Sequence, residues 1–490
     1  MGMLERVERA LPYISFAIVV GVVFLLSVHT LTSVYQDIGR HIRLGRIIWE
    51  TRHIPSTNLF SYTAPDFPFI DHHWLSEVFL YWGDRLVGLA GLIAIKAVIL
   101  AFAFGLSLAA AWKKSIAWPA AIVGLISAVI LIERTDVRPE ILSYLFLSWF
   151  LFVLYRYPKS RLVWTLPFVQ LLWVNSHIYF FMGPLVFCAW WAGEIAKHGR
   201  SLLTGTRTWL LAFAIAVATL LNPHGLSGAL YPLNVFHNYG YSVMENQSPH
   251  FLQSFGYPML TTYMLYIGIL LVVLSFVANW RRFREHIFGL IIFGATAMFA
   301  LIMIRNFALF ALCMLPVILK NISDINYHPN FRFPFRGLIV VWCILFSITI
   351  ITGQFYGQYG APYRQFGFIV PSGFDDPIAF YRAQNIHGPI FNNFDIGSYL
   401  IWKLPKEPVF VDGRPEAYPA SFFTDVYIPM QESVGAWNRY SQQYHINAII
   451  WDYGDITPWS QDFVARITHD PAWVSVYNAH SVMILVRKAR

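Results

Sequence analysis

Charged residues are scarce in this chain: they make up 13% of its 490 residues, against 57% hydrophobic and 17% aromatic residues. So few charges exclude an ordinary soluble enzyme and are typical of a membrane protein with many spans. The formal net charge is +8, but the basic residues gather in alternate connections between apolar runs. Membrane topology therefore explains most of the excess, and the charge does not indicate a nucleic-acid partner.

Cysteine is also rare. Cys188, Cys313 and Cys343 all fall inside apolar runs, where cysteine usually serves as a small packing residue. They indicate nothing about disulfides or the redox compartment. No internal repeat or low-complexity tract is visible, which leaves the long apolar runs as the main structural signal.

Eleven apolar runs divide the first 354 residues, and we interpret each as a transmembrane helix. The first run follows Arg6 and Arg9, but it is too long for a signal-peptide core and no small-residue cleavage site follows it, so we expect it to be retained. The eleven runs cover about 11–33, 88–112, 116–132, 139–155, 162–176, 179–196, 208–222, 258–278, 287–303, 306–319 and 337–354.

The distribution of Lys and Arg predicts the orientation. With the N-terminus in the cytoplasm, every second connection holds two or three basic residues, while the opposite loop 223–257 holds none. An odd number of spans then places residues 355–490 outside. We therefore predict a transmembrane domain over 1–354, with external loops 34–87 and 223–257, and an extracytoplasmic domain over 355–490.

The tail after residue 354 alternates strand-like and helical runs. This alternation predicts a small α/β domain, which is long enough to bury its own core. The strand-like runs are 389–394, 408–411, 447–451, 473–477 and 481–486, and the helical runs are 375–383, 396–404 and 459–468.

Residues 35–77 of the first external loop are the most polar segment of the first third of the chain. They carry four arginines, Arg40, Arg43, Arg46 and Arg52, on the side that is otherwise poor in them. External arginines beside a site usually serve an anion, so we interpret the loop as part of a polar site, although a solvated loop would be the plainer reading. We expect Arg40 to bind phosphate, and we expect a cavity lined by His41, His72, His73 and Glu77.

Three carboxylates on separate external segments are candidate catalytic groups: Asp37 after the first run, Asp136 between the third and fourth, and Glu245 in the loop without Lys or Arg. Together they could hold a divalent cation such as Mg²⁺ or Mn²⁺. One of them could instead act as a general base. Each could also be a solvated acid at the interface, but ionisable residues so close to spans are usually functional.

Two arginines on the same face complement these acids. Arg138 and Arg305 lie at the edges of apolar runs, where an unpaired charge is costly. A phosphate is a natural partner because guanidinium binds it in a bidentate manner; a structural pair with Asp136 or another loop acid is the alternative. Asn175 and His177, in the turn between the fifth and sixth runs, either line the same cavity or are satisfied turn residues.

These residues resemble the GT-C class of integral-membrane glycosyltransferases, in which an acid just after the first span is catalytic, as Asp37 would be here. Ser242–Gln247 (SVMENQ) resembles the SVSEHQ motif of oligosaccharyltransferase catalytic subunits, and Asn393–Gly397 (NFDIG) with Val411–Arg414 resembles the region of their WWDYG motif. Trp451–Gly454 (WDYG) matches that motif more literally, but it lies late in the tail and we interpret it as coincidental.

The chain is also similar to a group of uncharacterised bacterial GT-C proteins. The shared patterns are D-x-x-x-H from Asp37, P-x-x-x-x-F-S-x-T over Pro55–Thr63, W-x-x-E over Trp74–Glu77, N-x-H over Asn175–His177 and N-P-x-G over Asn222–Gly225. The resemblance implies transfer of a sugar from a polyprenyl-phosphate-linked donor to an acceptor at the outer face of the inner membrane. It also implies acceptor-binding residues in the tail, for which Asp395, Asp412 and Arg414 are the candidates.

Two other functions remain open from the residues alone. A transporter or flippase of lipid-linked glycans would use the same arginines but would need a polar path through the membrane midplane. Few charges lie deep in the apolar runs, and Lys96 is the exception. A non-catalytic envelope assembly protein, whose tail binds a partner, is the other alternative.

Overall fold

The computed structural model describes residues 3–32, 34–35, 37–199, 205–236, 239–256, 260–325, 333–359, 361 and 363–488. The chain forms two compact units. Unit 1 comprises Met1–Leu31, Leu89–Pro232 and Val243–Ile369; unit 2 comprises Thr32–Gly88, Leu233–Ser242 and Val370–Arg490.

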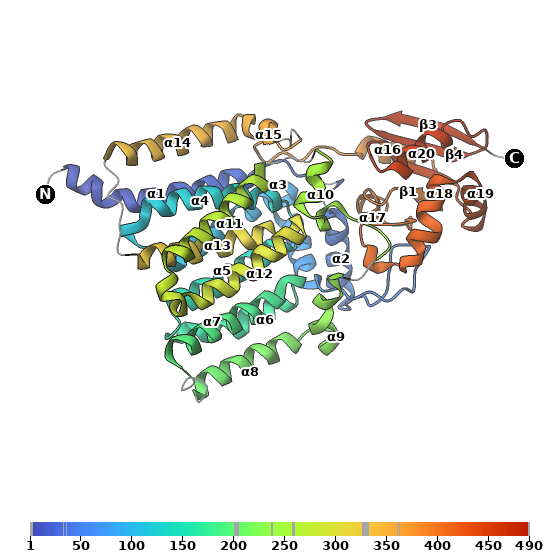
Figure 1. Cartoon of the computed structure of the whole chain (residues 1–490). Helices are drawn as coiled ribbons and strands as arrows, with labels where there is room; N and C mark the ends of the chain where they lie inside the picture. The colour runs from blue at the N-terminus through green and yellow to red at the C-terminus, as the bar shows by residue number, and fades with distance from the viewer. Residues whose placement is uncertain are drawn as a thin grey trace. The chain divides into compact units, whose positions relative to one another are not determined.

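Unit 1 is a bundle of helices (Figure 1). Helix α13 is its centre, because every residue from Phe307 to Leu319 is buried and the helix packs against α4, α5, α11 and α12. The longer helices are α1 (Met3–Ser27), α3 (Trp74–Ala111, shared with unit 2), α4 (Ala117–Leu131), α5 (Glu140–Arg156), α6 (Thr165–Val174), α7 (Met182–His198), α8 (Thr206–Leu220), α11 (Leu260–Ala278), α12 (Ile287–Ile302), α13 (Phe307–Asp324) and α14 (Phe333–Ile351). Short helices α9 (Gly225–Leu230), α10 (Pro249–Ser254) and α15 (Gln354–Tyr359) complete it.

Helices occupy all eleven ranges predicted from the apolar runs. Seven helices within the described residues are long and apolar enough to cross a membrane, or eight if the bent pair Thr206–Leu220 and Gly225–Asn234 is one span. The apolar helices Arg161–Val174 and Gly337–Ile351 are shorter. The predicted class, a multi-pass helical membrane protein, is therefore confirmed, while the count of eleven spans stays a prediction.

Unit 2 contains a four-stranded sheet with strand order β1-β2-β4-β3. Strands β1 (Ile390–Asn392) and β2 (Ala448–Asp452) are parallel, whereas β4 (Val482–Arg487) pairs antiparallel with both β2 and β3 (Trp473–Ala479). All five residues of β2 are buried, as expected for a central strand, whereas edge strand β3 is largely exposed or half-buried. The helices of this unit are α2 (Ile38–Thr51), α16 (Asp375–Ala383), α17 (Gly397–Lys403), α18 (Ile428–Glu432), α19 (Val434–Gln443) and α20 (Pro458–Ile467).

Four of the five predicted tail strands form, and the predicted strand 408–411 does not join the sheet. Instead, the Val409 amide donates to Phe60 O at 2.9 Å and Val409 O accepts from the Tyr62 amide at 3.2 Å, so this stretch pairs with the first external loop. Val34 from that loop also lies in the same hydrophobic core as Tyr399 and Ile450. The tail therefore shares its core with residues 32–88, which the sequence had assigned to the membrane domain.

Candidate functional site

Asp37 lies at the N-terminus of α2, in the left-handed backbone region with φ of 53°. Its carboxylate makes no capping hydrogen bond to the helix; instead, Oδ1 accepts from Ser398 Oγ at 2.7 Å. Gly413 approaches from the tail so closely that a Cβ there would lie 2.6 Å from Oδ1. One carboxylate oxygen is thus fixed by α17 and the 412–414 turn, and no hydrogen bond to Oδ2 is found among the described residues.

A buried acid–base cluster lies on the same loop, around Glu77, whose residue exposure is 0%. His41 Nδ1 lies 2.8 Å from Glu77 Oε1, and Arg40 Nη1 lies 3.8 Å from the same oxygen. Asp71 is close enough to interact with Glu77, and burial raises the pKa of Asp71 despite its hydrogen bond from the His73 amide.

The predicted cavity residues His72 and His73 belong to this neighbourhood. Their rings lie 4.0 Å apart by centroid, and the His73 ring lies 5.6 Å from that of His41. The structure therefore brings Arg40, His41, His72, His73 and Glu77 together, while the cavity expected between them stays a prediction. It adds Asp71, which no motif had marked. The signal for Asp71 was its position three residues before the W-x-x-E pattern.

Asp412 and Arg414 are fully buried and hold the tail to the first loop. Arg414 donates to both Asp412 oxygens at 2.7 Å and to Asn58 Oδ1 at 2.9 Å. Burial alone would raise the pKa of Asp412, but the Arg414 guanidinium holds it below its usual value. Of the three predicted acceptor-binding residues, only Asp395 has an exposed side chain.

The two stretches that resemble the WWDYG region lie side by side at the carboxyl ends of β1 and β2. Asn393 Oδ1 accepts from the Asp452 amide at 2.7 Å, and Asn393 Nδ2 donates to Asp452 O at 3.0 Å. Tyr35 donates its hydroxyl to Asp452 Oδ2 at 2.7 Å. Trp451–Gly454 lies late in the sequence, so this proximity was not expected. It arises because β2 is the parallel neighbour of β1.

Unit 1 contains a second cluster, built around Glu245. Glu245 pairs with Arg134 at 2.9 Å and with Arg138, while Arg134 also makes a two-bond pair with Glu140 at 2.7 and 2.8 Å. Burial would raise the pKa of Glu245, but Arg134 and Arg138 hold it well below its usual range. Glu245 is therefore an anion that is already matched by two cations.

Asp136 is the second predicted acid in unit 1. Arg364 Nη2 lies 3.3 Å from its Oδ2, and His29 Nε2 lies 3.9 Å from its Oδ1. Burial opposes ionisation, but the Arg364 guanidinium keeps the pKa of Asp136 well below its usual value. Lys96 Nζ lies 3.4 Å from His29 Nε2, and no ion pair between Lys96 and an acid is found in the described ranges.

Arg305 makes no ion pair among the described residues. Its Nη1 donates to Asn246 Oδ1 at 3.0 Å, and its guanidinium lies 5.9 Å from the centroid of the Tyr179 ring. The Nε of Arg305 is buried and makes no hydrogen bond in the described part of the chain, and the same is true of the Nε of Arg364. Arg305 differs from Arg134 and Arg138 because those two arginines pair with carboxylates.

Asn175 and His177 are occupied by local contacts. Asn175 Nδ2 donates to Leu171 O at 2.8 Å and Leu221 O at 2.9 Å, while His177 Nδ1 lies 3.0 Å from Ser143 Oγ. Of the unit 1 groups, His29, Lys96, Arg134 and Arg364 were not predicted. Lys96 was the visible signal, as a single charge inside an apolar run, whereas Arg364 lies beyond the expected end of the membrane domain.

Comparisons with known proteins give fold-level matches. No family model and no curated protein matches the chain. Among solved structures, the archaeal oligosaccharyltransferase AglB from Archaeoglobus fulgidus, in complex with an inhibitory peptide and a dolichol-phosphate, matches with a TM-score of 0.57 at 12% identity, over 95% of this chain and 71% of that one.

Two further structures are similar. The Archaeoglobus fulgidus oligosaccharyltransferase in complex with Zn and sulfate matches with a TM-score of 0.52 at 14% identity, over 90% of this chain and 68% of that one. ArnT from Cupriavidus metallidurans bound to undecaprenyl phosphate has a TM-score of 0.49 at 13% identity, over 97% and 98% of the two chains. The predicted resemblance to GT-C glycosyltransferases is thus confirmed at the level of the fold.

Proposed function

We propose that this chain is a GT-C-type glycosyltransferase that moves a sugar from a polyprenyl-phosphate-linked donor to an acceptor at the extracytoplasmic face of the membrane. The fold supports the reaction class. AglB, whose match extends across 95% of this chain, was solved with a dolichol-phosphate. The observation that carries the proposal is Arg305 in unit 1, whose guanidinium makes no ion pair and whose Nε is buried without a hydrogen bond among the described residues. A lipid-linked phosphate supplies an anion for this guanidinium.

The other arginines of the two unit 1 clusters are paired with carboxylates. Arg134 pairs with Glu140 and Glu245, Arg138 pairs with Glu245, and Arg364 pairs with Asp136. Arg305 makes no ion pair with a carboxylate among the described residues, so it is the primary phosphate ligand in this proposal. Arg138, which pairs with Glu245, is the second candidate. Arg40, which lies in unit 2, is already engaged with Glu77.

The chemistry is a displacement at the anomeric carbon. Asp37 accepts the proton of an acceptor hydroxyl or amide as the oxygen or nitrogen of that group forms its bond to the anomeric carbon. The bond from this carbon to the phosphate oxygen breaks, and the phosphate leaves with the electron pair. Its charge is stabilised by guanidinium groups that are already oriented before the reaction. Ser398 positions Asp37 by donating to one carboxylate oxygen.

A divalent cation does not fit the two acids of unit 1. Glu245 and Asp136 each face arginines, and no group of three His, Cys, Asp or Glu side chains that could hold a metal ion is found among the described residues. Guanidinium groups occupy the space and charge that a cation would take. The proposed mechanism therefore assigns the phosphate to arginines and contains no step through a metal.

The decisive experiment is Asp37→Asn in purified protein reconstituted with a polyprenyl-phosphate-linked sugar. Asn keeps the oxygen that accepts from Ser398 but is not basic, so we expect donor binding to persist and turnover to fall by about a hundredfold or more. Asp66→Asn, at an exposed acid of the same loop, is the matched control and should turn over normally.

Normal turnover by Asp37→Asn would remove Asp37 from the reaction and make Glu245 the next acid to test. If the wild-type protein consumes no lipid-linked sugar but moves it between leaflets, the chain is a flippase and the proposal is wrong.

A further inference from the structure

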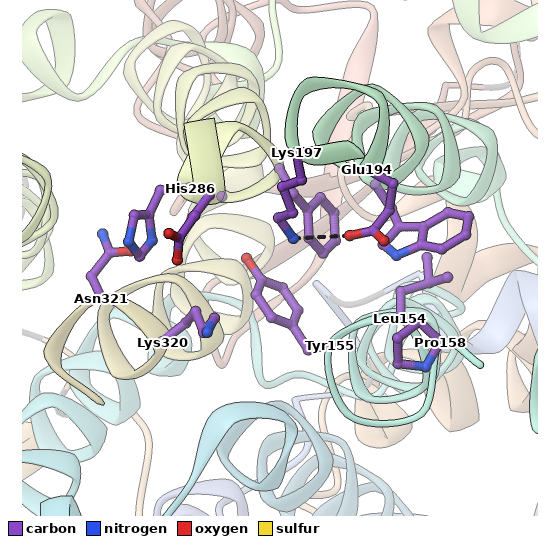
Figure 2. Close-up of a pocket in the computed structure, with 12 residues that line it drawn as sticks. Leu154, Tyr155, Pro158, Glu194, Lys197, His286, Lys320 and Asn321 are labelled. Carbon is purple, nitrogen blue, oxygen red and sulfur yellow. Dashed lines mark hydrogen bonds and ion pairs between the residues drawn. The ribbon is translucent and has the colours of Figure 1, made fainter. Parts of the chain in front are cut away.

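A pocket with apolar and charged lining residues lies between the ends of α5, α7, α12 and α13 in unit 1 (Figure 2). It is far from the Glu245 cluster along α5, because that helix begins at Glu140 beside the cluster and reaches the pocket at Tyr155. Its volume is about 90 Å³. One water needs ~10–15 Å³ by this kind of measure, so the pocket has room for several water-sized groups.

Two buried polar side chains in this pocket make no hydrogen bond among the described residues. The His286 side chain is 2% exposed, and neither ring nitrogen makes a hydrogen bond, although Nε2 lies 3.8 Å from Asp324 Oδ2. The adjacent Asn321 donates its amide to Ser275 instead, at 2.8 Å. The Tyr155 hydroxyl is also buried without a partner among the described residues. Buried polar groups are nearly always satisfied, so these atoms point to a ligand.

Both signs of charge line the pocket in equal number. Lys197 pairs with Glu194 at 2.9 Å, Lys320 pairs with Asp324 beside the pocket at 2.7 Å, and Glu285 completes the charged lining. Figure 2 shows Tyr155, Lys197 and Lys320 extending into the space between the helices. A simple anion would meet the two carboxylates, and a simple cation would meet the two ammonium groups. A zwitterion, with one charge of each sign, complements the lining.

The surroundings of the pocket indicate a membrane surface. Tyr157, Trp280 and Phe283, close in sequence to lining residues, are 43%, 69% and 53% exposed, and exposed aromatic side chains gather at the level of lipid headgroups. Arg281, Arg282 and Arg284 lie in the same connection, which is one of the basic connections predicted to face the cytoplasm. Lipid is therefore the source of ligand that this position favours.

We infer that this pocket binds the zwitterionic headgroup of an aminophospholipid. Its phosphate accepts from the Tyr155 hydroxyl and the lysines, and its ammonium group donates to Glu285 and to the unprotonated nitrogen of His286. A primary ammonium has three N–H donors for these acceptors, whereas the trimethylammonium group of phosphatidylcholine has none. The site is separate from the residues assigned to sugar transfer, so it stands or falls independently of that function.

The test counts lipids bound to the purified full-length protein by native mass spectrometry. Micelles are supplied with phosphatidylethanolamine, phosphatidylcholine or phosphatidylglycerol at equal concentration. We expect phosphatidylethanolamine to be retained over the other two. Tyr155→Phe and His286→Gln should each weaken its binding by about tenfold, as for loss of a hydrogen bond to a charged group. Tyr157→Phe, at an exposed tyrosine two residues away, should bind like the wild type.

Two results would overturn the inference. Equal or stronger retention of phosphatidylglycerol would show an anion site or non-specific binding in place of a zwitterion site. Unchanged phosphatidylethanolamine binding in both pocket variants, with their thermal stability intact, would place the bound lipid elsewhere on the protein.

Discussion

At the scale of single residues, Arg305 and Arg134 show how the same side chain type serves different ends. Arg134 is committed to Glu140 and Glu245, which form a structural ion network. Arg305 donates to the Asn246 amide oxygen and lies over the Tyr179 ring, and it makes no ion pair with a carboxylate among the described residues. An arginine without a carboxylate near hydrocarbon is costly unless a ligand neutralises it.

Arg305→Lys is expected to weaken binding of the lipid-linked donor. Lysine keeps the charge but loses the planar group that contacts a phosphate through two N–H donors. Removing such a bidentate contact should raise the donor Kd by about tenfold or more, on the scale of a hydrogen bond to a charged group. Donor titration with purified protein measures this. Arg161→Lys is the control, because Arg161 is exposed and follows the C-terminal end of α5, away from the Glu245 cluster at its N-terminal end; it should leave the donor Kd unchanged. If Arg305→Lys also left the donor Kd unchanged, Arg305 would have a structural role.

Asp71 predicts a pH dependence of stability. Burial raises its pKa in the folded protein, while the unfolded chain releases this proton near the ordinary value of about 3.9. As pH rises above that value, the unfolded state loses its proton first and becomes relatively more favourable. Asp71 therefore stabilises the fold least at neutral pH.

Asp71→Asn removes this titration and keeps an oxygen for the His73 amide. We expect the Tm of the variant, relative to the wild type, to increase as the pH rises from 4.5 and to level off above the folded-state pKa of Asp71. Asp66→Asn, at an exposed acid of the same loop, is the control. A flat difference for Asp71→Asn would mean that Asp71 is ionised in the fold.

At the scale of elements, the packing of α2 on α17 positions Asp37. Gly39 faces α17 so closely that a Cβ there would lie 2.7 Å from Trp402 Cβ and 3.1 Å from Ser398 O. Ser398, on the same helix, donates to Asp37. The glycine of the D-x-x-x-H pattern thus lets the two helices approach until the carboxylate meets its partner.

Gly39→Ala should force α17 outwards. Overpacking of this kind costs about 1–3 kcal/mol, and it should also lower turnover because Ser398 moves away from Asp37. Gly435→Ala, in α19 of the same unit, has only Ser433 Oγ within reach, at 3.7 Å, and should be neutral or slightly stabilising. Thermal unfolding and turnover of both variants test this contrast. A Gly39→Ala protein with wild-type Tm and turnover would show that the approach of α2 to α17 is not needed.

Sequence patterns predicted the helices and strands more reliably than the contacts between them. Apolar length alone located the eleven helices, because a membrane-spanning helix has to satisfy its backbone internally. The strand at 408–411 was predicted from its apolar character, yet Val409 pairs with Phe60 and Tyr62, some 350 positions earlier. Such pairing depends on tertiary contacts that no local pattern encodes, and the same reason hid Arg364 beside Asp136.

At the scale of the whole molecule, the first loop and the tail form one folding unit despite their separation in sequence. Arg414 and Asn58 bond across this separation at 2.9 Å, and Tyr62 donates its hydroxyl to Ile390 O at 2.9 Å. Because a single unit cannot be divided by a bilayer, residues 32–88 and the tail have to be on the same side of the membrane. The first loop leaves the membrane after one span, so the number of later spans must return the chain to that side.

This requirement decides between span counts. With the N-terminus in the cytoplasm, one span puts the first loop outside. Only an odd total, such as seven or eleven, then puts the tail on the same side; a total of eight, with the bent pair as one span, does not.

A reporter that is active only outside the cytoplasm, inserted after residue 354 in the full chain, should therefore be active. The same reporter after His198, at the end of α7 in a connection predicted to be cytoplasmic, should be silent. Activity reversed at both positions would mean that the N-terminus is outside, with the unit still intact. A silent reporter at 354 together with an active one inserted in the exposed segment at Asp66 would place the loop and the tail on opposite sides, which contradicts the shared unit and, with it, the position of Asp37 against Ser398.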